Sequence, residues 1–238
     1  MNRNGKEKQH RANRMICGAP LVYMDAAEMR ECAVCNRVFP ANASCQAGHF
    51  VCDECHSMGA LSFLVPLLLE SKEKSPQRLL EEVMSNPKVH MHGPEHHSIV
   101  PCVLLTAYHN CGGELELTRA LREAVRRGKQ VPGGSCGYLG ACGAAVGAGI
   151  FASIALGSSP LSGENWALPQ QLTGECLSLN AAVGGPRCCK RTSRTAISAG
   201  VRFAKEHLGV AMEDEFLPCV YPGHNTECLK NGCPFYTE

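Results

Sequence analysis

Four cysteines near the start of the chain have the type and the spacing to bind a metal ion. They form two CxxC pairs, Cys32/Cys35 and Cys52/Cys55, with sixteen residues between the pairs. A CxxC turn presents two thiolates to one ion, and Zn²⁺ prefers four ligands at the corners of a tetrahedron. We therefore predict one closed Zn²⁺ site, which folds a segment that is too small to fold alone.

Two more potential ligands, Cys45 and His49, lie between these pairs. The six residues together resemble the first six ligands of a RING finger. A RING finger completes a second site with a further CxxC nearby, but the next cysteines here are Cys102 and Cys111. The second site is therefore either missing or completed from far away in the chain, and ubiquitin-ligase activity is not expected. The simpler interpretation is a zinc ribbon or a treble-clef-like knuckle.

A cluster of histidines follows in the stretch HMHGPEHH. It contains His90, His92, Glu95, His96 and His97. Neutral imidazole is a common metal ligand and titrates near neutral pH. We predict that His92 and at least one of His96 and His97 face one cleft, where they transfer protons, hold a substrate or bind a metal. The alternative is a polar loop that caps a helix starting near Glu95.

A second set of cysteines lies in stretches that lead into expected helices or close the chain. The set consists of Cys136 and Cys142 in GGSCGYLGACGAA, Cys188 and Cys189 in GGPRCCKR, and Cys219, Cys228 and Cys233 near the end of the chain. Helix N-termini and nearby cations lower the pKa of a thiol, so this set is predicted to supply thiolates. Glycines let backbone N–H groups approach an anionic ligand or a cluster sulfide.

The first two pairs of this set are predicted to converge in space, because each lies where a glycine-rich turn enters a helix. One of Cys188 and Cys189 should point away, since adjacent residues rarely ligate together. The pocket would hold a [4Fe–4S] cluster, hold zinc or attack sulfur directly. Charge for a cluster or a small anionic substrate would come from Arg187, Lys190 and Arg191. The alternatives are a second zinc site and cysteines that merely fill a core of small residues.

The remaining chain predicts helices, so the expected fold class is mainly α. We expect a disordered tail at 1–14, a zinc-binding module at 15–57 and an all-α domain at 58–238. Ser75 and Pro76 begin one helix as its N-cap and first residue. The uncharged stretch at 140–157 is rich in alanine and glycine, which predicts a central buried helix rather than a membrane span. A weaker helix follows Trp166, with Pro169 in its first turn.

Composition argues against several classes of function. The net charge is +1 and aromatic residues make up 5% of the chain, which speaks against nucleic-acid binding. The first fifteen residues are polar and show no apolar signal-peptide core. We therefore expect a cytoplasmic protein, whose sixteen cysteines stay reduced and serve metal or redox sites.

The segments CGAPLVY, GPEHH, GGSCGYLGACGAA and GGPRCCKR, with the paired CxxC motifs, resemble an uncharacterised Cys-rich prokaryotic family. That family is known only as a domain of unknown function, sometimes fused to methyltransferase or radical-chemistry enzymes. The resemblance covers residues 15–238 and adds Cys17 as a candidate ligand of the second site. We predict a metalloprotein, either an iron–sulfur redox protein or a sulfur-transfer protein, with a structural zinc site. The alternative is a non-catalytic zinc-containing adaptor that docks a partner enzyme.

Overall fold

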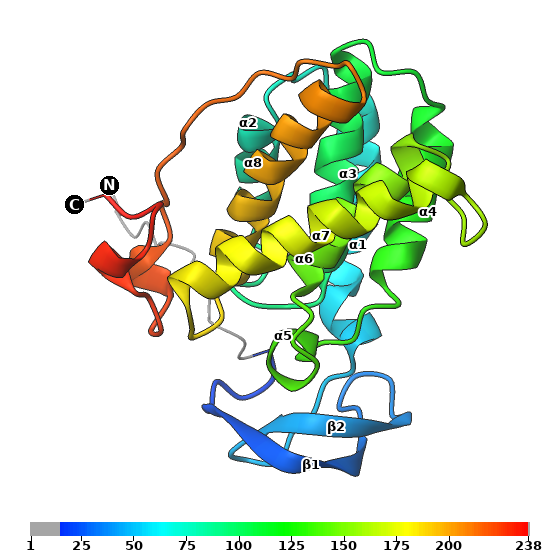
Figure 1. Cartoon of the computed structure of the whole chain (residues 1–238). Helices are drawn as coiled ribbons and strands as arrows, with labels where there is room; N and C mark the ends of the chain where they lie inside the picture. The colour runs from blue at the N-terminus through cyan, green and yellow to red at the C-terminus, as the bar shows by residue number, and fades with distance from the viewer. Residues whose placement is uncertain (1–14, 238) are drawn as a thin grey trace, which may run out of the picture.

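The structure is a computed structural model that describes residues 15–237, so the predicted tail at 1–14 lies outside the described residues. It begins with an antiparallel hairpin of β1 (Leu21–Glu31) and β2 (Val38–Cys45). Leu21 pairs with Cys45 at one end of the hairpin and Glu31 with Val38 at the other. Figure 1 shows the hairpin below one end of a bundle of helices.

The bundle follows without further strands in the described part of the chain. Its helices are α1 (Asp53–Glu70), α2 (Pro76–Ser85), α3 (Glu95–Asn110), α4 (Leu117–Gly128), α5 (Ser135–Tyr138), α6 (Gly143–Ala155), α7 (Gly163–Val183) and α8 (Cys189–His207), and the short 3-10 helices η1 (Pro222–His224) and η2 (Lys230–Gly232) come last. A small hairpin module followed by an all-α domain confirms the predicted fold class. No described helix is long and apolar enough to span a membrane.

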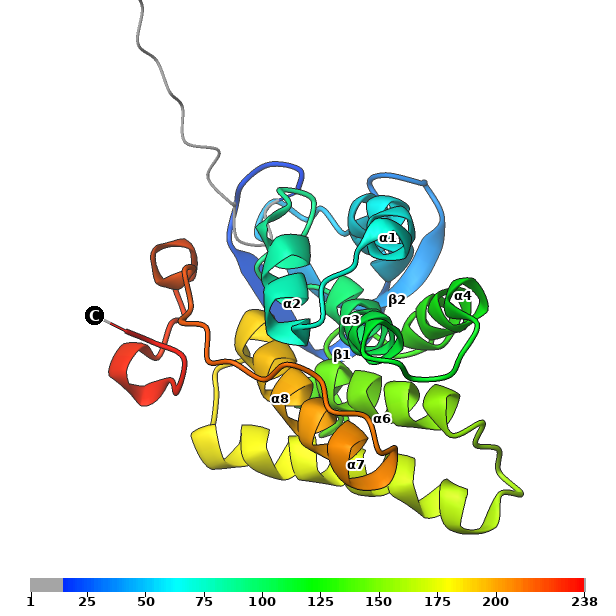
Figure 2. The ribbon, with the colours of Figure 1, turned by 90° about the horizontal axis from the view of Figure 1, so that it is seen from above.

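Helix α3 forms the centre of the bundle. Every one of its residues from 95 to 108 is buried, and α1, α2, α4, α6 and α8 all pack against it. Figure 2 shows α3 in this central position, with α6, α7 and α8 on one side. Its buried charged and imidazole side chains all belong to its first turn, so the polar groups gather at the end that faces the hairpin.

Helix α6 contacts its neighbours through glycines. A Cβ atom on Gly143 would lie 2.1 Å from Cδ2 of His97 on α3, and one on Gly149 would lie 2.1 Å from Oγ1 of Thr173 on α7. Neither approach leaves room for a side chain, because real Cβ contacts are longer than 3.0 Å. The uncharged stretch is therefore a central helix whose missing side chains let α3 and α7 come close.

Helices α1 and α7 both continue through a proline. Helix α1 begins at Asp53 and continues through Pro66, so it crosses the predicted boundary at residue 57 and is shared by the module and the bundle. Helix α7 begins at Gly163, which places Pro169 beyond the first turn, where proline removes a backbone hydrogen bond. The carbonyl of Asn165, four residues before Pro169, accepts a hydrogen bond from the Ser158 hydroxyl instead.

Candidate functional site

The paired CxxC motifs come together where the hairpin meets α1. Cys32 and Cys35 lie in the turn between the strands, and Cys52 and Cys55 lie at the start of α1. Their sulfur atoms all lie within 4.8 Å of one another, so the group could hold a metal ion. The backbone N–H of Cys52 donates to Sγ of Cys32 at 3.4 Å, and the sulfurs of Cys35 and Cys52 are 3.9 Å apart.

A nearby cation would favour ionisation of the four thiols of this group. Burial raises the pKa of the Cys32 thiol, but N–H groups of Cys52, Cys35 and Val34 lower it to about 6. Burial raises the pKa of Cys52, and burial together with the neighbouring sulfurs raises that of Cys55. Four thiolates cannot ionise together in so small a volume without positive charge, which a bound metal ion supplies. The donor set is that of a closed metal site.

A second group lies at the other end of the hairpin. It consists of Cys17, Cys45 and His49, whose ligand atoms also lie within 4.8 Å of one another. Sγ of Cys45 is 3.5 Å from Sγ of Cys17 and 3.4 Å from Nδ1 of His49. Among residues 15–237 no fourth ligand atom joins this group. The RING-like spacing supplies only Cys45 and His49 to this second site. Cys17, which precedes the hairpin, adds a third potential ligand.

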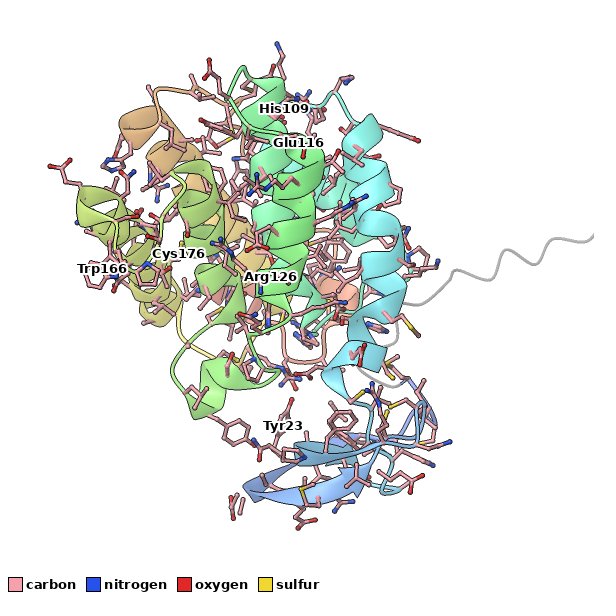
Figure 3. All side chains as sticks on the ribbon, turned by 90° about the vertical axis from the view of Figure 1, so that its right-hand side faces the viewer. Tyr23, His109, Glu116, Arg126, Trp166 and Cys176 are labelled. Atoms are coloured by element: carbon pink, nitrogen blue, oxygen red, sulfur yellow. The ribbon has the colours of Figure 1, made fainter. Side chains whose placement is uncertain are left out.

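A cavity of about 1240 Å³ lies between the hairpin and the bundle. Figure 3 shows Tyr23 in the space between the two parts. The Arg187 guanidinium stacks over the Tyr23 ring at 5.1 Å, and the Tyr138 hydroxyl donates to the carbonyls of Met24 and Asn42 at 3.2 and 3.3 Å. These contacts tie the hairpin to the bundle, so the cavity has walls from both.

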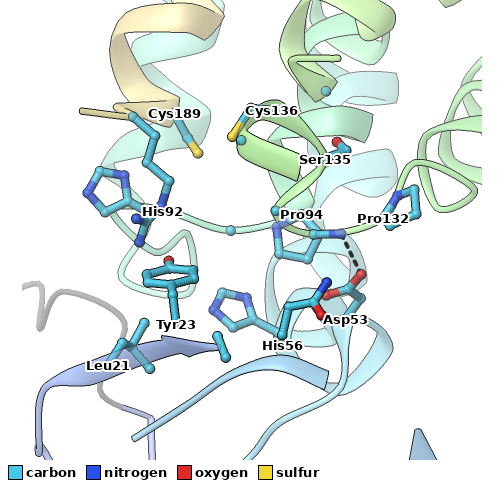
Figure 4. Close-up of a pocket in the computed structure, with 18 of the residues that line it drawn as sticks. Leu21, Tyr23, Asp53, His56, His92, Pro94, Pro132, Ser135, Cys136 and Cys189 are labelled. Atoms are coloured by element: carbon cyan, nitrogen blue, oxygen red, sulfur yellow. Dashed lines mark hydrogen bonds between the residues drawn. The ribbon is translucent and has the colours of Figure 1, made fainter. Parts of the chain in front are cut away.

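Asp53 makes a further connection near the cavity. Its carboxylate accepts a hydrogen bond of 2.6 Å from the backbone N–H of Gly133, shown as a dashed line in Figure 4. A Cβ on Gly133 would lie 2.5 Å from that carboxylate, so only glycine permits the contact. The glycine-rich turn before α5 is thereby held against the first turn of α1.

The predicted pairs of cysteines line this cavity. Cys136 lies in α5, Cys142 is the N-cap of α6, and Cys188 and Cys189 are the N-cap and first residue of α8. The thiols of Cys136, in α5, and Cys189, at the start of α8, both point into the cavity (Figure 4). The structure thus brings the two pairs to one cavity, but no three of these sulfurs lie within 4.8 Å of one another among the described residues.

Burial opposes the predicted thiolate character of Cys136, Cys188 and Cys189. Burial raises the pKa of Cys136 and of Cys188, and it raises the pKa of Cys189 to about 12. Arg187 and Arg191 act in the opposite direction, but their effect is smaller than the cost of burying a thiolate. These three thiols therefore ionise less readily than a free cysteine, and a base or a metal would favour their ionisation.

The imidazole of His56 is a base in the same cavity, and sequence reasoning missed this residue. The buried carboxylate of Glu95 accepts hydrogen bonds from Nδ1 of His56 at 3.1 Å and from Nδ1 and the backbone N–H of His90 at 3.0 Å. His56 lines the cavity. A carboxylate at Nδ1 fixes the tautomer and leaves Nε2 as the basic nitrogen. The three residues could also hold a metal ion. His56 directly follows the second CxxC, but nothing in its spacing connects it with Glu95.

The predicted histidines line the same cavity but are engaged in the fold. His92 bonds through Nε2 to Asn225 at 3.3 Å, and His97 donates from Nδ1 to the Val131 carbonyl at 3.0 Å. His96 has no exposed surface and contacts Ser193 and the His90 carbonyl. Burial lowers the pKa of His92 to about 4 and that of His96 to about 3. These imidazoles stay neutral and position the turn before α3.

Of the three predicted cations, Arg187 and Arg191 line the large cavity and Lys190 does not. Arg191 donates to the carbonyls of Gly184 and Pro186. Lys190 does not supply charge there, because its amine is buried, donates to the Met84 carbonyl at 3.0 Å and lies over the Tyr221 ring at 4.6 Å. Burial lowers its pKa to about 8. The remaining metal candidates, Cys219, Cys228 and Cys233, lie outside the large cavity, beside the start of α8.

Comparison with known proteins finds one family. The model of DUF5714, described as a family of unknown function, matches residues 64–236. The match includes the histidine cluster and the whole second set of cysteines, whereas the CxxC module lies before it. No curated protein and no solved structure matches the chain.

Proposed function

Because the chain belongs to DUF5714, a family of unknown function, its activity has to be inferred from the site, and we propose that it is a metalloprotein that carries out thiol chemistry in the large cavity. The chemistry is redox or sulfur transfer on a small anionic substrate. The observation that carries the proposal is the placement of Cys136, Cys142 and Cys189 in one cavity beside the Glu95–His56 pair.

The N-terminal groups are assigned a structural role. Four thiolates from Cys32, Cys35, Cys52 and Cys55 form a closed tetrahedral set, which Zn²⁺ prefers and which leaves no position for a substrate. A Zn²⁺ ion there would hold the hairpin turn to the start of α1. It would thereby fix one wall of the cavity, including Tyr23 and His56.

The thiol chemistry needs a proton acceptor, since the cysteine pKa values are raised. His56 accepts the proton of the attacking thiol, and Glu95 stabilises the imidazolium that results. The Cys136 thiolate then attacks one sulfur of a disulfide substrate and expels the other as a thiolate. A second cavity thiol resolves the mixed disulfide, so the protein ends with a disulfide and the substrate with two thiols, which take up the two protons. Arg187 offers charge for an anionic substrate.

Glutathione disulfide is a suitable probe, because it is an anionic disulfide. After anaerobic purification, Cys136 should form a mixed disulfide before any other cysteine, as read by mass spectrometry of digested protein. Cys136→Ala should abolish this adduct, and His56→Ala should slow it. Cys111→Ala is the matched control, because Cys111 lies outside the cavity and donates to the Lys74 carbonyl. If Cys136 reacts no faster than Cys111, thiol chemistry in the cavity is wrong.

The alternative of an adaptor is favoured by one observation. Leu161 is 96% exposed and Trp166 is 52% exposed, and both lie at the turn into α7, away from the cavity. Large apolar side chains exposed in this way are typical of surfaces that bind another protein. An adaptor needs no cavity thiol, so the glutathione experiment separates the two proposals.

A further inference from the structure

The three cysteines near the C-terminus form a second cysteine-rich place that is separate from the large cavity. After α8 the chain runs back along the bundle and folds into a compact end, drawn in orange to red in Figure 1. The backbone N–H of Cys219 donates to the Phe235 carbonyl at 2.7 Å, which closes this end on itself. It lies beside the start of α8, where Cys188 is the N-cap.

Four cysteines are among the residues that line one small cavity of about 20 Å³ at this place. Its lining includes Cys188 from the start of α8 and Cys219, Cys228 and Cys233 from the C-terminal end. All four are free thiols. Cys188 lines both cavities, whereas Cys189 lines only the large cavity and points into it (Figure 4).

The backbone around these sulfurs is arranged as it is around metal-bound thiolates. Three of the sulfurs accept a hydrogen bond from a backbone N–H group. The Arg191 N–H donates to Sγ of Cys188 at 3.5 Å. The Tyr221 N–H donates to Sγ of Cys219 at 3.5 Å, and the Lys230 N–H donates to Sγ of Cys228 at 3.4 Å. Cys32, in the N-terminal metal group, accepts an N–H in the same way. Hydrogen bonds to sulfur stabilise the thiolate form and tune the clusters that it binds.

Two buried arginines also line this place. Arg191 and Arg194 are each only 5% exposed, and both line the small cavity. Their terminal nitrogens are already engaged, those of Arg191 with the Gly184 and Pro186 carbonyls and those of Arg194 with the Glu81 carboxylate and the Leu217 carbonyl. The Nε atom of each is buried without a hydrogen-bond partner. A buried guanidinium N–H without a partner is costly, and an anionic group in the cavity would remove that cost. Four thiolates around a cationic metal centre form such a group.

The sulfurs around the small cavity are grouped less closely than the N-terminal four. With Zn–S bonds of about 2.3 Å, tetrahedral thiolates lie roughly 3.8 Å apart, and the N-terminal four lie within 4.8 Å of one another. Among the described residues, no three of the four sulfurs around the small cavity come that close together. A [4Fe–4S] cluster holds its thiolates further apart, because each binds a different iron.

We propose that Cys188, Cys219, Cys228 and Cys233 are the four ligands of a [4Fe–4S] cluster. The cluster fastens the C-terminal end to the start of α8, next to the wall of the large cavity. The assignment does not rest on the thiol chemistry proposed for that cavity. It differs from the predicted shared site on Cys136, Cys142, Cys188 and Cys189, for which a cluster was one of three alternatives, and it retains only Cys188.

Reconstitution tests the proposal. The full chain, purified and treated with iron and sulfide without oxygen, should bind about four iron and four sulfide per chain and absorb near ~400 nm. Cys219→Ser and Cys233→Ser should lose this absorbance. Cys136→Ser and the matched control Cys111→Ser should keep it. A colourless chain, zinc bound by the four cysteines, or loss of the absorbance in Cys136→Ser but not in Cys219→Ser would each overturn the assignment.

Protection from alkylation tests the same site without a variant that might fail to fold. In the reconstituted wild-type chain, iodoacetamide should leave Cys188, Cys219, Cys228 and Cys233 unmodified and should label Cys136. After removal of iron with a chelator, at least the partly exposed members of the four should become labelled. Equal labelling of the four before and after iron removal shows that they are not ligands and overturns the proposal.

Discussion

Replacing Gly93 by alanine should break the hydrogen bond between the Glu95 carboxylate and His56, although neither of these two residues is substituted. A Cβ at this position would lie 2.1 Å from Oε2 of Glu95 and 2.5 Å from Cε1 of His56. Ordinary contacts begin at 3.4 Å, so the carboxylate has to move by more than 1 Å. Its hydrogen bonds of 3.0 and 3.1 Å cannot survive a shift of this size.

The cost follows from the bonds that are lost. A hydrogen bond to a charged group contributes about 1.5–3 kcal/mol, and the displaced carboxylate stays buried. Loss of one to two such bonds predicts a decrease of about 3 kcal/mol in the free energy of unfolding. For a chain of this length that lowers Tm by about 6–12 °C. The measurement is urea unfolding followed by circular dichroism, in parallel with thermal melting.

Gly174→Ala is the matched control. Gly174 lies inside α7, and a Cβ there would meet no atom within 4 Å. Alanine in a helix interior is favoured over glycine by about 0.5–1 kcal/mol, so this variant should be slightly more stable than the wild type. If Gly93→Ala is as stable as Gly174→Ala, the close contact of Gly93, Glu95 and His56 is wrong.

Three further predictions concern the metal group, the cavity thiol and pH. Cys35→Ser should lose the metal of the N-terminal group and make the hairpin sensitive to protease while the bundle keeps its helical signal; retention of the full metal content by mass spectrometry would contradict the closed site. The rate of Cys136 alkylation should still rise above pH 9, since desolvation at the cavity wall raises the pKa of that thiol above 9.0, and a plateau below pH 9 would contradict the raised pKa. Burial opposes ionisation of Glu95, but the histidine hydrogen bonds hold its folded pKa well below 4.5. The contribution of ionised Glu95 to the free energy of unfolding is therefore fully present above about pH 4.5, and it is lost as the pH falls further. The stability difference between wild type and Glu95→Gln in urea should shrink over that acid range, and a difference that grows there would refute the sign.

Sequence reasoning succeeded where the information is local. The spacing of the CxxC pairs predicted their convergence, because a metal site dictates how its ligands are spaced along the chain. Ser75 and Pro76 marked the start of α2, where the Ser75 hydroxyl accepts a hydrogen bond from the Arg78 N–H. Likewise, the resemblance to a domain of unknown function was confirmed by the family match.

Burial is the property that the sequence pattern did not indicate. Cys188 and Cys189 lie at a helix start among basic residues, which predicts low pKa values, but their depth in the fold raises them. Lys190 looks like a surface cation and is buried against Tyr221. Glu95 and His56 are thirty-nine residues apart, and only the packing of α1 beside α3 brings them together.

The glycines of α6 have a consequence for how this chain can change over evolutionary time. Gly143 and Gly149 carry no functional group, yet any side chain at either position would meet His97 or Thr173. Because α6 begins at Cys142 and α3 begins at Glu95, wider spacing between these helices would displace the residues at the cavity. We therefore expect substitutions to be rarer at these two positions than at Gly163 and Gly174, where a Cβ meets nothing. In this fold, selection for the site acts on positions that take no part in its chemistry.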